Sequence, residues 1–279
     1  MGHRCFEVDV AAKVAHVRLS RPDELNSMVR EFWTELPEII RDLDARGDVR
    51  AVVLSSTGRH FTAGLDLAVF TAGFPGMSSD GEIGRSRAYL RQVLMVLQDA
   101  FSSLEQARMP VLAAVQGGCI GGGVDLVCAA DMRYASADAF FQVAETNVGM
   151  TADVGTLQRL PKLIPEGLAR ELAYTGRRLT APRAAELGFV NEVFATHEEL
   201  VAGVLEIAAE IAAKSPLAVW GVKEMLLHAR DHSVADGLAH VAAWQTGMFQ
   251  APDLMESITA RAEGREPEYP DLLPIPDGL

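Results

Sequence analysis

Two short, strongly apolar runs constrain the fold of this chain more than any other feature. Residues 51–56 (AVVLSS) and 110–115 (PVLAAV) consist mainly of β-branched and small apolar residues, a composition typical of strands buried on both faces of a sheet. Apolar residues at helical spacing precede the first run, at 29–43, and separate the two runs, at 86–107. This alternation predicts βαβ units, a mainly parallel sheet and right-handed connections.

The same reading extends the pattern toward both ends of the chain. We expect two short strands within 6–19, a short helix at 124–130 and a strand at 132–135. Residues 68–85 are rich in Gly, Ser and Pro, and their length favours a substrate-facing loop.

The second half of the chain is predicted to be mostly helical. Helical signals follow residue 157, at 165–174, 181–187, 197–214, 216–231 and 233–249. We therefore expect an α/β core over 1–195, a helical C-terminal region over 196–265 and a proline-rich tail over 266–279.

Charge and cysteine content exclude several classes of protein. The formal net charge of −13 disfavours a nucleic-acid or anionic membrane surface, because both need a basic patch. The three cysteines provide no disulfide framework, and no Cys or His spacing indicates a metal site. The first ten residues lack an apolar signal core and no run is long enough to span a membrane, so a cytoplasmic protein is expected.

Two glycine-centred turns are candidate ligand-binding elements. Residues 61–66 (FTAGLD) follow the first buried strand, and 117–125 (GGCIGGGVD) follow the second. Glycine lets backbone N–H groups approach a ligand closely, so convergent turns would form an oxyanion hole. Two ordinary strand-to-helix turns are the alternative reading, and neither segment matches a dinucleotide or P-loop motif.

Three acidic residues lie in apolar or glycine-rich surroundings. Asp125, Glu145 and Asp153 all fall within 29 positions, next to residues expected to be buried. A carboxyl group in an apolar pocket has a raised pKa and can transfer protons. A helix cap or an ion pair also explains each residue alone, and Asp153 could cap a helix that begins at Val154. No G-x-S-x-G motif supports a serine hydrolase.

These motifs resemble those of the crotonase (enoyl-CoA hydratase/isomerase) superfamily. The pair FTAGLDL and CIGGGVDL is similar to its oxyanion-hole signature, and the stretch FFQVAETNVGMTADVGTLQRLPKLI resembles its Δ3,5-Δ2,4-dienoyl-CoA isomerases. The resemblance covers about residues 6–255. It implies a ββα spiral core with a helical C-terminal trimerisation region, and an acyl-CoA thioester as substrate with no separate cofactor. A homotrimer or a hexamer built as a dimer of trimers is implied as well.

The resemblance also assigns roles to individual residues. Leu65 and Gly122 match the positions whose N–H groups hold the thioester oxygen. Asp125 and Glu145 fall where hydratases carry two glutamates, and Asp153 falls where the dienoyl isomerases carry an aspartate. The residues expected to line the substrate site are Arg21, Leu25, Ala63, Gly64, Asp66 and Gly121.

The implied reaction moves the double bonds of a 3,5-dienoyl-CoA to the 2,4-positions, as in fatty-acid β-oxidation. Glu145 would remove a proton from C2, Asp153 would add one at C6, and Asp125 would position or polarise the others. Asn147 stands where the pattern often has an acidic residue, which reduces the local charge. Lys223 is either a solvated surface charge or a group near the nucleotide. An enoyl-CoA hydratase or other acyl-CoA lyase, and an inactive acyl-CoA-binding or scaffold subunit, remain alternatives.

Overall fold

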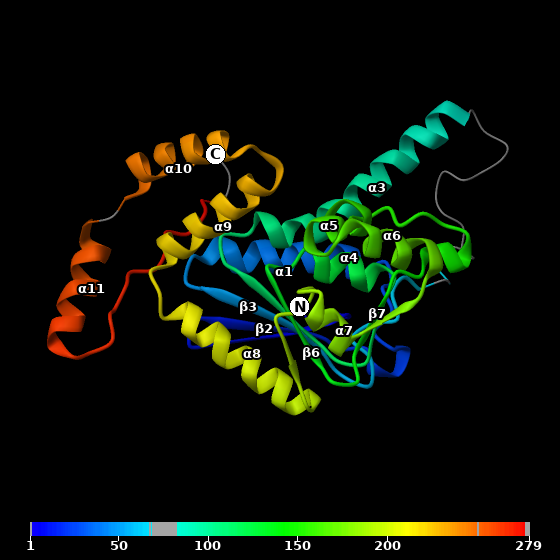
Figure 1. Ribbon diagram of the computed structural model, residues 1–279, viewed down its shortest axis with the longest axis horizontal. Helices are drawn as coiled ribbons and strands as arrows, with labels where there is room; N and C mark the ends of the chain where they lie inside the picture. The colour runs from blue at the N-terminus through cyan, green and yellow to red at the C-terminus, as the bar shows by residue number, and fades with distance from the viewer. Residues whose placement is uncertain (1, 67, 69–82, 250, 277–279) are drawn as a thin grey trace.

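A six-stranded sheet forms the frame of the molecule (Figure 1). The computed structural model describes residues 2–66, 68, 83–249 and 251–276. The strands follow the order β1 (Phe6–Ala11), β2 (Val14–Leu19), β3 (Ala51–Ser56), β4 (Val111–Val115), β6 (Met132–Ser136) and β9 (Glu192–Phe194). Only β1 pairs antiparallel with its neighbour within this sheet; the other pairs are parallel. The predicted parallel sheet and N-terminal hairpin are therefore confirmed.

The sheet is buried on both faces, which explains the apolar character of β3 and β4. Alternate strand residues point to opposite faces. Val52 and Leu54 belong to the larger apolar core, with α1 (Phe32–Arg46) and α3 (Ile83–Gln106). Val53 and its neighbours on the other face pack against α8 (His197–Ala212).

A second, three-stranded sheet continues from the end of β4. It consists of β5 (Gly118–Ile120), β7 (Phe140–Gln142) and β8 (Arg178–Thr180), with β5 parallel and β8 antiparallel to β7. The chain therefore passes from the first sheet into the second through the glycine-rich segment 117–123. Within that segment, Gly118–Ile120 form β5 of the second sheet, and Gly122 begins the helix α4 (Gly122–Cys128).

The remaining helices agree in part with the sequence prediction. Those expected from periodicity are α6 (Glu166–Thr175), α7 (Ala181–Glu186), α9 (Pro216–Asp231) and α10 (Val234–Met248). Not predicted were the one-turn helices η1 (Pro22–Glu24) and η2 (Glu145–Val148), and the longer α11 (Ala251–Glu263). Helix α5 (Thr156–Leu163) was considered only as a helix that would begin at Val154. Pro161 inside the eight residues of α5 obscured its periodicity. Most of the loop predicted at 68–85 lies outside the described residues, but α3 already begins at Ile83.

The C-terminal part does not separate cleanly from the core. Helix α8 covers one face of the sheet, while α9, α10 and α11 extend to the left in Figure 1. The proline-rich segment predicted as a tail lies back against the core, because Arg50 Nη2 donates to Tyr269 O (2.6 Å) and to Asp271 Oδ1 (2.8 Å). None of the described helices is long and apolar enough to cross a membrane.

Candidate active site

The two glycine-centred turns meet at the junction of the sheets. The Thr62 N–H donates to Gly118 O (3.1 Å), and the Ile120 N–H donates to Thr62 O (3.2 Å). This short parallel bridge fastens the first turn to β5. Segments more than 50 positions apart thus form one rigid unit, as expected for an oxyanion hole built from two turns.

Gly64 makes the close approach of the turns possible. Its φ of +84° belongs to the left-handed region, and a Cβ at this position would lie 2.6 Å from Ile120 O. The same Cβ position would lie 3.5 Å from the Gly122 nitrogen. Gly64 therefore faces Gly122, and Leu65 is the next residue along the chain. A side chain at position 64 would push the two turns apart.

The two predicted oxyanion-hole residues have backbone donors free for a ligand. Within the described residues, the N–H groups of Leu65 and Gly122 have no hydrogen-bond acceptor. Gly122 is the first residue of α4, and Leu65 is half-buried beside Met28. Unpaired N–H donors at such a junction suit an oxygen on which negative charge develops.

Asp125 is the most deeply buried of the three carboxylates. It lies on α4 with no exposed surface, and its Oδ1 accepts a hydrogen bond of 2.5 Å from the Thr156 N–H. Its Oδ2 has no hydrogen-bond partner among the described residues. Burial, followed by the negative charge of Glu145, raises the pKa of Asp125 to about 7.

Glu145 faces the second glycine turn. It is the first residue of η2, and its Oε1 lies 3.3 Å from the point where a Cβ on Gly121 would stand. Its Oε2 is buried without a partner in the described part of the chain. Burial and, to a smaller extent, the charge of Asp153 raise the pKa of Glu145.

Asp153 lies in the irregular segment between η2 and α5. It is half-buried, and burial raises its pKa. The idea that Asp153 caps a helix is wrong, because α5 begins at Thr156 and its first N–H is held by Asp125. The charges of Glu145 and Asp153 both act on Asp125, so the three carboxyl groups form one coupled set.

The predicted substrate-lining residues Arg21, Leu25 and Asp66 form one wall around the first glycine-centred turn. Leu25, in the left-handed region and 44% exposed, accepts the Ala63 N–H through its carbonyl (2.9 Å). Asp66 accepts hydrogen bonds from Ser27 Oγ (3.3 Å) and from the Ala68 N–H (2.9 Å). The Arg21 guanidinium donates to Ser27 O (2.6 Å), so it braces this wall from within. Contact of these residues with substrate stays a prediction.

Lys223 is not the solvated surface charge that the sequence allowed. Only 5% of the residue is exposed, and its Nζ lies 2.9 Å from Asp131 Oδ2. It also donates to Leu104 O (2.6 Å) and Met109 O (3.0 Å). Lys223 therefore fastens α9 to the end of α3 and does not lie on the surface.

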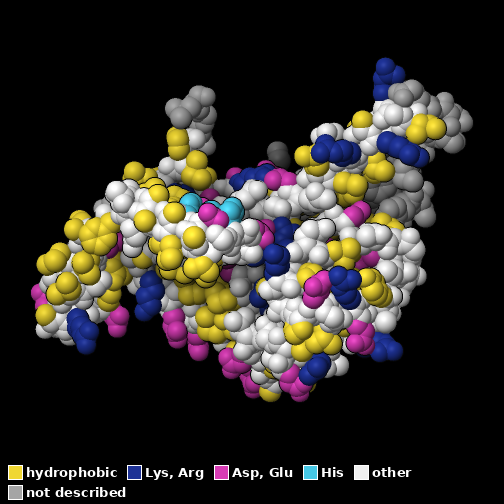
Figure 2. All heavy atoms as spheres, turned by 45° about the horizontal axis from the view of Figure 1, so that its top comes forward, with side chains coloured by type: hydrophobic (Ala, Val, Ile, Leu, Met, Phe, Trp, Pro, Cys, Tyr) yellow, Lys and Arg dark blue, Asp and Glu magenta, His cyan; other side chains and the backbone are white. Residues whose placement is uncertain are grey.

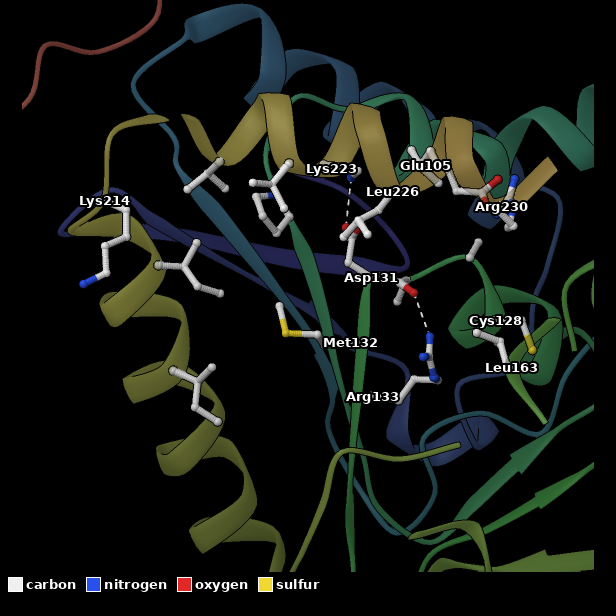
Figure 3. Close-up of a pocket in the computed structure, with 18 of the residues that line it drawn as sticks. Glu105, Cys128, Asp131, Met132, Arg133, Leu163, Lys214, Lys223, Leu226 and Arg230 are labelled. Atoms are coloured by element: carbon white, nitrogen blue, oxygen red, sulfur yellow. Dashed lines mark hydrogen bonds and ion pairs between the residues drawn. The ribbon is translucent and has the colours of Figure 1, made fainter. Parts of the chain in front are cut away.

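A cavity of about 630 Å³ lies beside Lys223 (Figure 3). Helices α8 and α9 and the start of β6 enclose it, and Met132 and Leu226 contribute to its mostly apolar lining. Asp125, Glu145 and Asp153 do not line it. Acids and bases do line this space, but Asp131 is paired with Lys223 and Glu105 with Arg159, so we do not assign the chemistry to it.

Three residues around Asp153 had no signal in the sequence. Gln98 on α3 donates to Asp153 O (2.8 Å), and Arg159 on α5 pairs with Glu105 Oε2 (2.6 Å). They are 54 and 55 positions from their partners, and no local motif marks them. Among the described residues, no group of three His, Cys, Asp or Glu is placed to hold a metal ion.

Comparison with known proteins agrees with this geometry. Residues 9–272 match the family model described as enoyl-CoA hydratase/isomerase. The chain is 47% identical over 254 residues to the mitochondrial Δ3,5-Δ2,4-dienoyl-CoA isomerase of Pongo abelii, covering 91% of this chain and 77% of that one. It is 42% identical over 261 residues to the peroxisomal enzyme of the same name from Arabidopsis thaliana, covering 94% of each.

Solved structures show the same fold. The crystal structure of enoyl-CoA hydratase from Bacillus anthracis superposes with a TM-score of 0.85 at 32% identity, covering 95% of this chain and 99% of that one. The expected cytoplasmic location is contradicted, because the relatives from Pongo abelii and Arabidopsis thaliana are named mitochondrial and peroxisomal. The crotonase-like fold is confirmed, and the chain belongs to the enoyl-CoA hydratase/isomerase family.

Proposed function

We propose that this protein is a Δ3,5-Δ2,4-dienoyl-CoA isomerase. The observation that carries the proposal is the set of three carboxyl groups with raised pKa, Asp125, Glu145 and Asp153, beside two convergent turns with free N–H donors. The names of the relatives described above support the same reaction.

The proposed mechanism begins at the thioester carbonyl. The N–H groups of Leu65 and Gly122 hold the carbonyl oxygen, which makes the C2 proton acidic. Glu145 removes that proton, and the electron pair of the broken C–H bond spreads through the enolate and both double bonds to C6. Asp153 then donates a proton to C6, which yields the 2,4-dienoyl thioester.

The electrostatics of the site favour Glu145 as the base and Asp153 as the acid. Asp153 has to carry a proton before the reaction, and its burial favours the protonated form. Two neighbouring carboxyl groups that repel each other do not ionise together easily, so an ionised Glu145 favours a protonated Asp153. Asp125 is a third ionisable group whose charge is coupled to theirs, and its carboxylate accepts a hydrogen bond from the first N–H of α5.

An ultraviolet assay with two substrates tests the function. We expect a 3,5-dienoyl-CoA to give the conjugated 2,4-dienoyl absorbance, while a 2-enoyl-CoA is not hydrated. Asp153→Asn should lower isomerisation by about 10²- to 10⁴-fold, the usual contribution of a general acid. Asp42→Asn on the exposed face of α1 serves as the control. Full isomerase activity in Asp153→Asn, or rapid hydration by the wild type, would overturn the assignment.

The acyl-CoA site is proposed to belong to an assembly of identical subunits. Yellow side chains gather over α9, α10 and α11 at the left of Figure 2. Their exposed members include Leu226 (67%), Val234 (81%), Leu238 (64%) and Met255 (56%). Helix α10 has no buried residue within the described chain, which favours burial against further copies.

Light scattering after size-exclusion chromatography tests the assembly. The wild type should elute as a trimer or as a dimer of trimers. Leu238→Glu combined with Met255→Glu should give smaller species, because two charges would be buried in an apolar interface. Ile83→Glu, an equally exposed apolar position on α3, is the matched control. A monomeric wild type would contradict the proposal.

A further inference from the structure

The segment that carries Asp153 has little regular structure to hold it. Between η2 and α5, the Met150 N–H donates to Glu145 O (2.9 Å), but residues 151–153 belong to no helix or strand. The position of the Asp153 carboxyl therefore depends on contacts from other elements. Proton transfer needs donor and acceptor within hydrogen-bond reach, so those contacts bear on the reaction.

One face of α3 supplies these contacts. Gln98, Ser102 and Glu105 are spaced by four and three positions, so they lie along the same face of the helix. Gln98 Nε2 donates to the Asp153 carbonyl oxygen (2.8 Å). One turn further, Ser102 Oγ and Glu105 Oε2 accept hydrogen bonds from Arg159 Nη2 (3.1 and 2.6 Å).

Arg159 closes the other side of the same segment. Gly155 has a φ of +138°, and a Cβ there would lie 1.9 Å from Arg159 Nη1. The guanidinium thus lies directly against the Gly155 backbone. Glu105, which holds Arg159, also pairs with Arg230 of α9, so the contact is anchored from two helices.

Ala152 and Val154, on either side of Asp153, are buried in the apolar core, whereas polar side chains lie on the side of the segment that faces α3. A cavity of about 360 Å³ lies there, lined by Gln98, Ser102, Glu105, Val154, Gly155 and Arg159 among others. A tightly packed core would hold the backbone without help from polar groups. On this side, the exposed Gln98 amide holds the Asp153 carbonyl by a hydrogen bond, in addition to the apolar anchoring of its two neighbours.

We propose that Gln98 is a positioning residue that acts through Asp153. This inference rests on the proposed function, since it concerns the group that protonates C6. By holding the Asp153 carbonyl from α3, Gln98 keeps the carboxyl over the far end of the dienolate. Removal of the C2 proton by Glu145 does not require this contact, because Glu145 lies on η2 against Gly121.

Separation of the two proton transfers provides the test. Gln98→Met keeps the shape of the side chain and removes the donor, and Gln92→Met on the exposed surface of α3 is the matched control. Isomerisation is followed by ultraviolet absorbance, and exchange of the C2 hydrogen in deuterated water by mass spectrometry. For Gln98→Met we expect kcat of isomerisation to fall roughly 5- to 50-fold, with C2 exchange, KM and Tm close to wild type. The control should match wild type in every measurement.

Each of the other possible results would overturn the role of Gln98 or the proposed function. Equal isomerisation rates in Gln98→Met and wild type would overturn the positioning role alone. Parallel loss of isomerisation, C2 exchange and thermal stability would also overturn it, because that pattern indicates a purely structural residue. A wild type that exchanges C2 without isomerising would overturn the proposed function and, with it, the role of Gln98.

Discussion

Asp125 Oδ1 accepts the Thr156 N–H at 2.5 Å, so a carboxylate of α4 holds the first turn of α5. The bond favours the ionised form of Asp125, whereas burial and the charge of Glu145 favour the protonated form. The second pair of effects prevails, and the pKa of Asp125 rises to about 7. A single residue thus links the electrostatics of the site to the packing of two helices.

Asp125→Asn should stabilise the protein in alkaline solution. The folded-state pKa of about 7 lies above the ordinary aspartate pKa of 3.8, so folding favours the protonated carboxyl. That stability is complete below the unfolded pKa and is lost as the pH rises through the folded pKa. Since Asn cannot ionise, we expect the variant to gain about 1–3 kcal/mol over wild type near about pH 8.5, and much less near about pH 4.5.

Urea unfolding at the two pH values measures this effect, with the exposed Asp42→Asn as control. The variant should also lose isomerase activity. Equal destabilisation of Asp125→Asn at both pH values would show that the Thr156 bond outweighs the cost of burying the charge.

Gly121→Ala should impair both stability and activity. Gly121 has φ +54° and ψ −120°, which side chains rarely adopt, and its Cβ would lie 3.3 Å from Glu145 Oε1. We expect a loss of about 1–3 kcal/mol in unfolding free energy from backbone strain. Displacement of the Glu145 carboxylate should lower kcat at least about tenfold.

Gly167→Ala in α6 is the control for backbone substitution. No heavy atom of the described residues lies within 4 Å of its added Cβ, so this variant should gain about 0.5–1 kcal/mol. Thermal unfolding and the isomerase assay measure both variants. Wild-type activity in Gly121→Ala would show that the glycine turn does not determine the position of the Glu145 carboxylate.

Lys223→Met should loosen the attachment of α9. The change leaves Asp131 and two backbone carbonyls without their buried partner, and breaking such a pair costs about 3–5 kcal/mol. Lys162→Met is the matched control, because its pair with Asp231 (3.4 Å) is half-exposed and worth less than about 1 kcal/mol. Denaturant unfolding and hydrogen exchange of α9 measure the difference. Similar losses of unfolding free energy in the two variants would show that the buried Lys223–Asp131 pair holds α9 no more firmly than an exposed ion pair.

Acid should weaken the contact between α9 and α10. The rings of His228 and His232 stack at 3.8 Å, and those of His228 and His240 at 4.1 Å. Burial and these two neighbours lower the pKa of His228, although Asp236 and Glu224 partly oppose the shift. The fold therefore favours neutral His228, and its contribution is present above the unfolded pKa of about 6.5 and lost as the pH falls below it.

Tryptophan fluorescence reports on this contact. Trp220 of α9 and Trp244 of α10 meet edge to face with ring centroids 5.0 Å apart. We expect their emission to change as the pH falls below about 6.5, and His228→Gln to flatten the change. The exposed His3→Gln should behave as wild type. An unaltered pH profile in His228→Gln would exclude the histidine stack as the cause.

The sequence predicted those parts of the molecule that have a local signature. Buried strands such as Ala51–Ser56 have a recognisable composition, and a turn such as 117–123 has its glycines. The burial of Lys223 depends on Leu104 and Met109, more than 100 positions away, so no local pattern indicated it. The attachment of Asp271 to Arg50 likewise joins residues 221 positions apart.

The candidate site likewise contains some residues that have a local sequence signature and others that have none. Asp125, Glu145 and Asp153 were found from their surroundings in the sequence and from the family motif. Gln98 was missed, because a glutamine on an amphipathic helix has the same local pattern whether it contacts solvent or a catalytic segment. A helix cap was one reading of Asp153, but it is Asp125, 31 positions away, that accepts the Thr156 N–H, and the sequence does not show which side chain reaches that group.

The oxyanion hole that we propose at Leu65 and Gly122 consists of main-chain groups, and every amino acid except proline carries the same N–H. Side chains around it can therefore diverge over evolutionary time while the group that activates the thioester is inherited unchanged. The carboxylates lie on three separate elements, α4, η2 and the segment before α5. A lineage with this scaffold can thus acquire a different reaction by replacing a few acidic residues, while the backbone N–H groups proposed to make the C2 proton acidic stay in place.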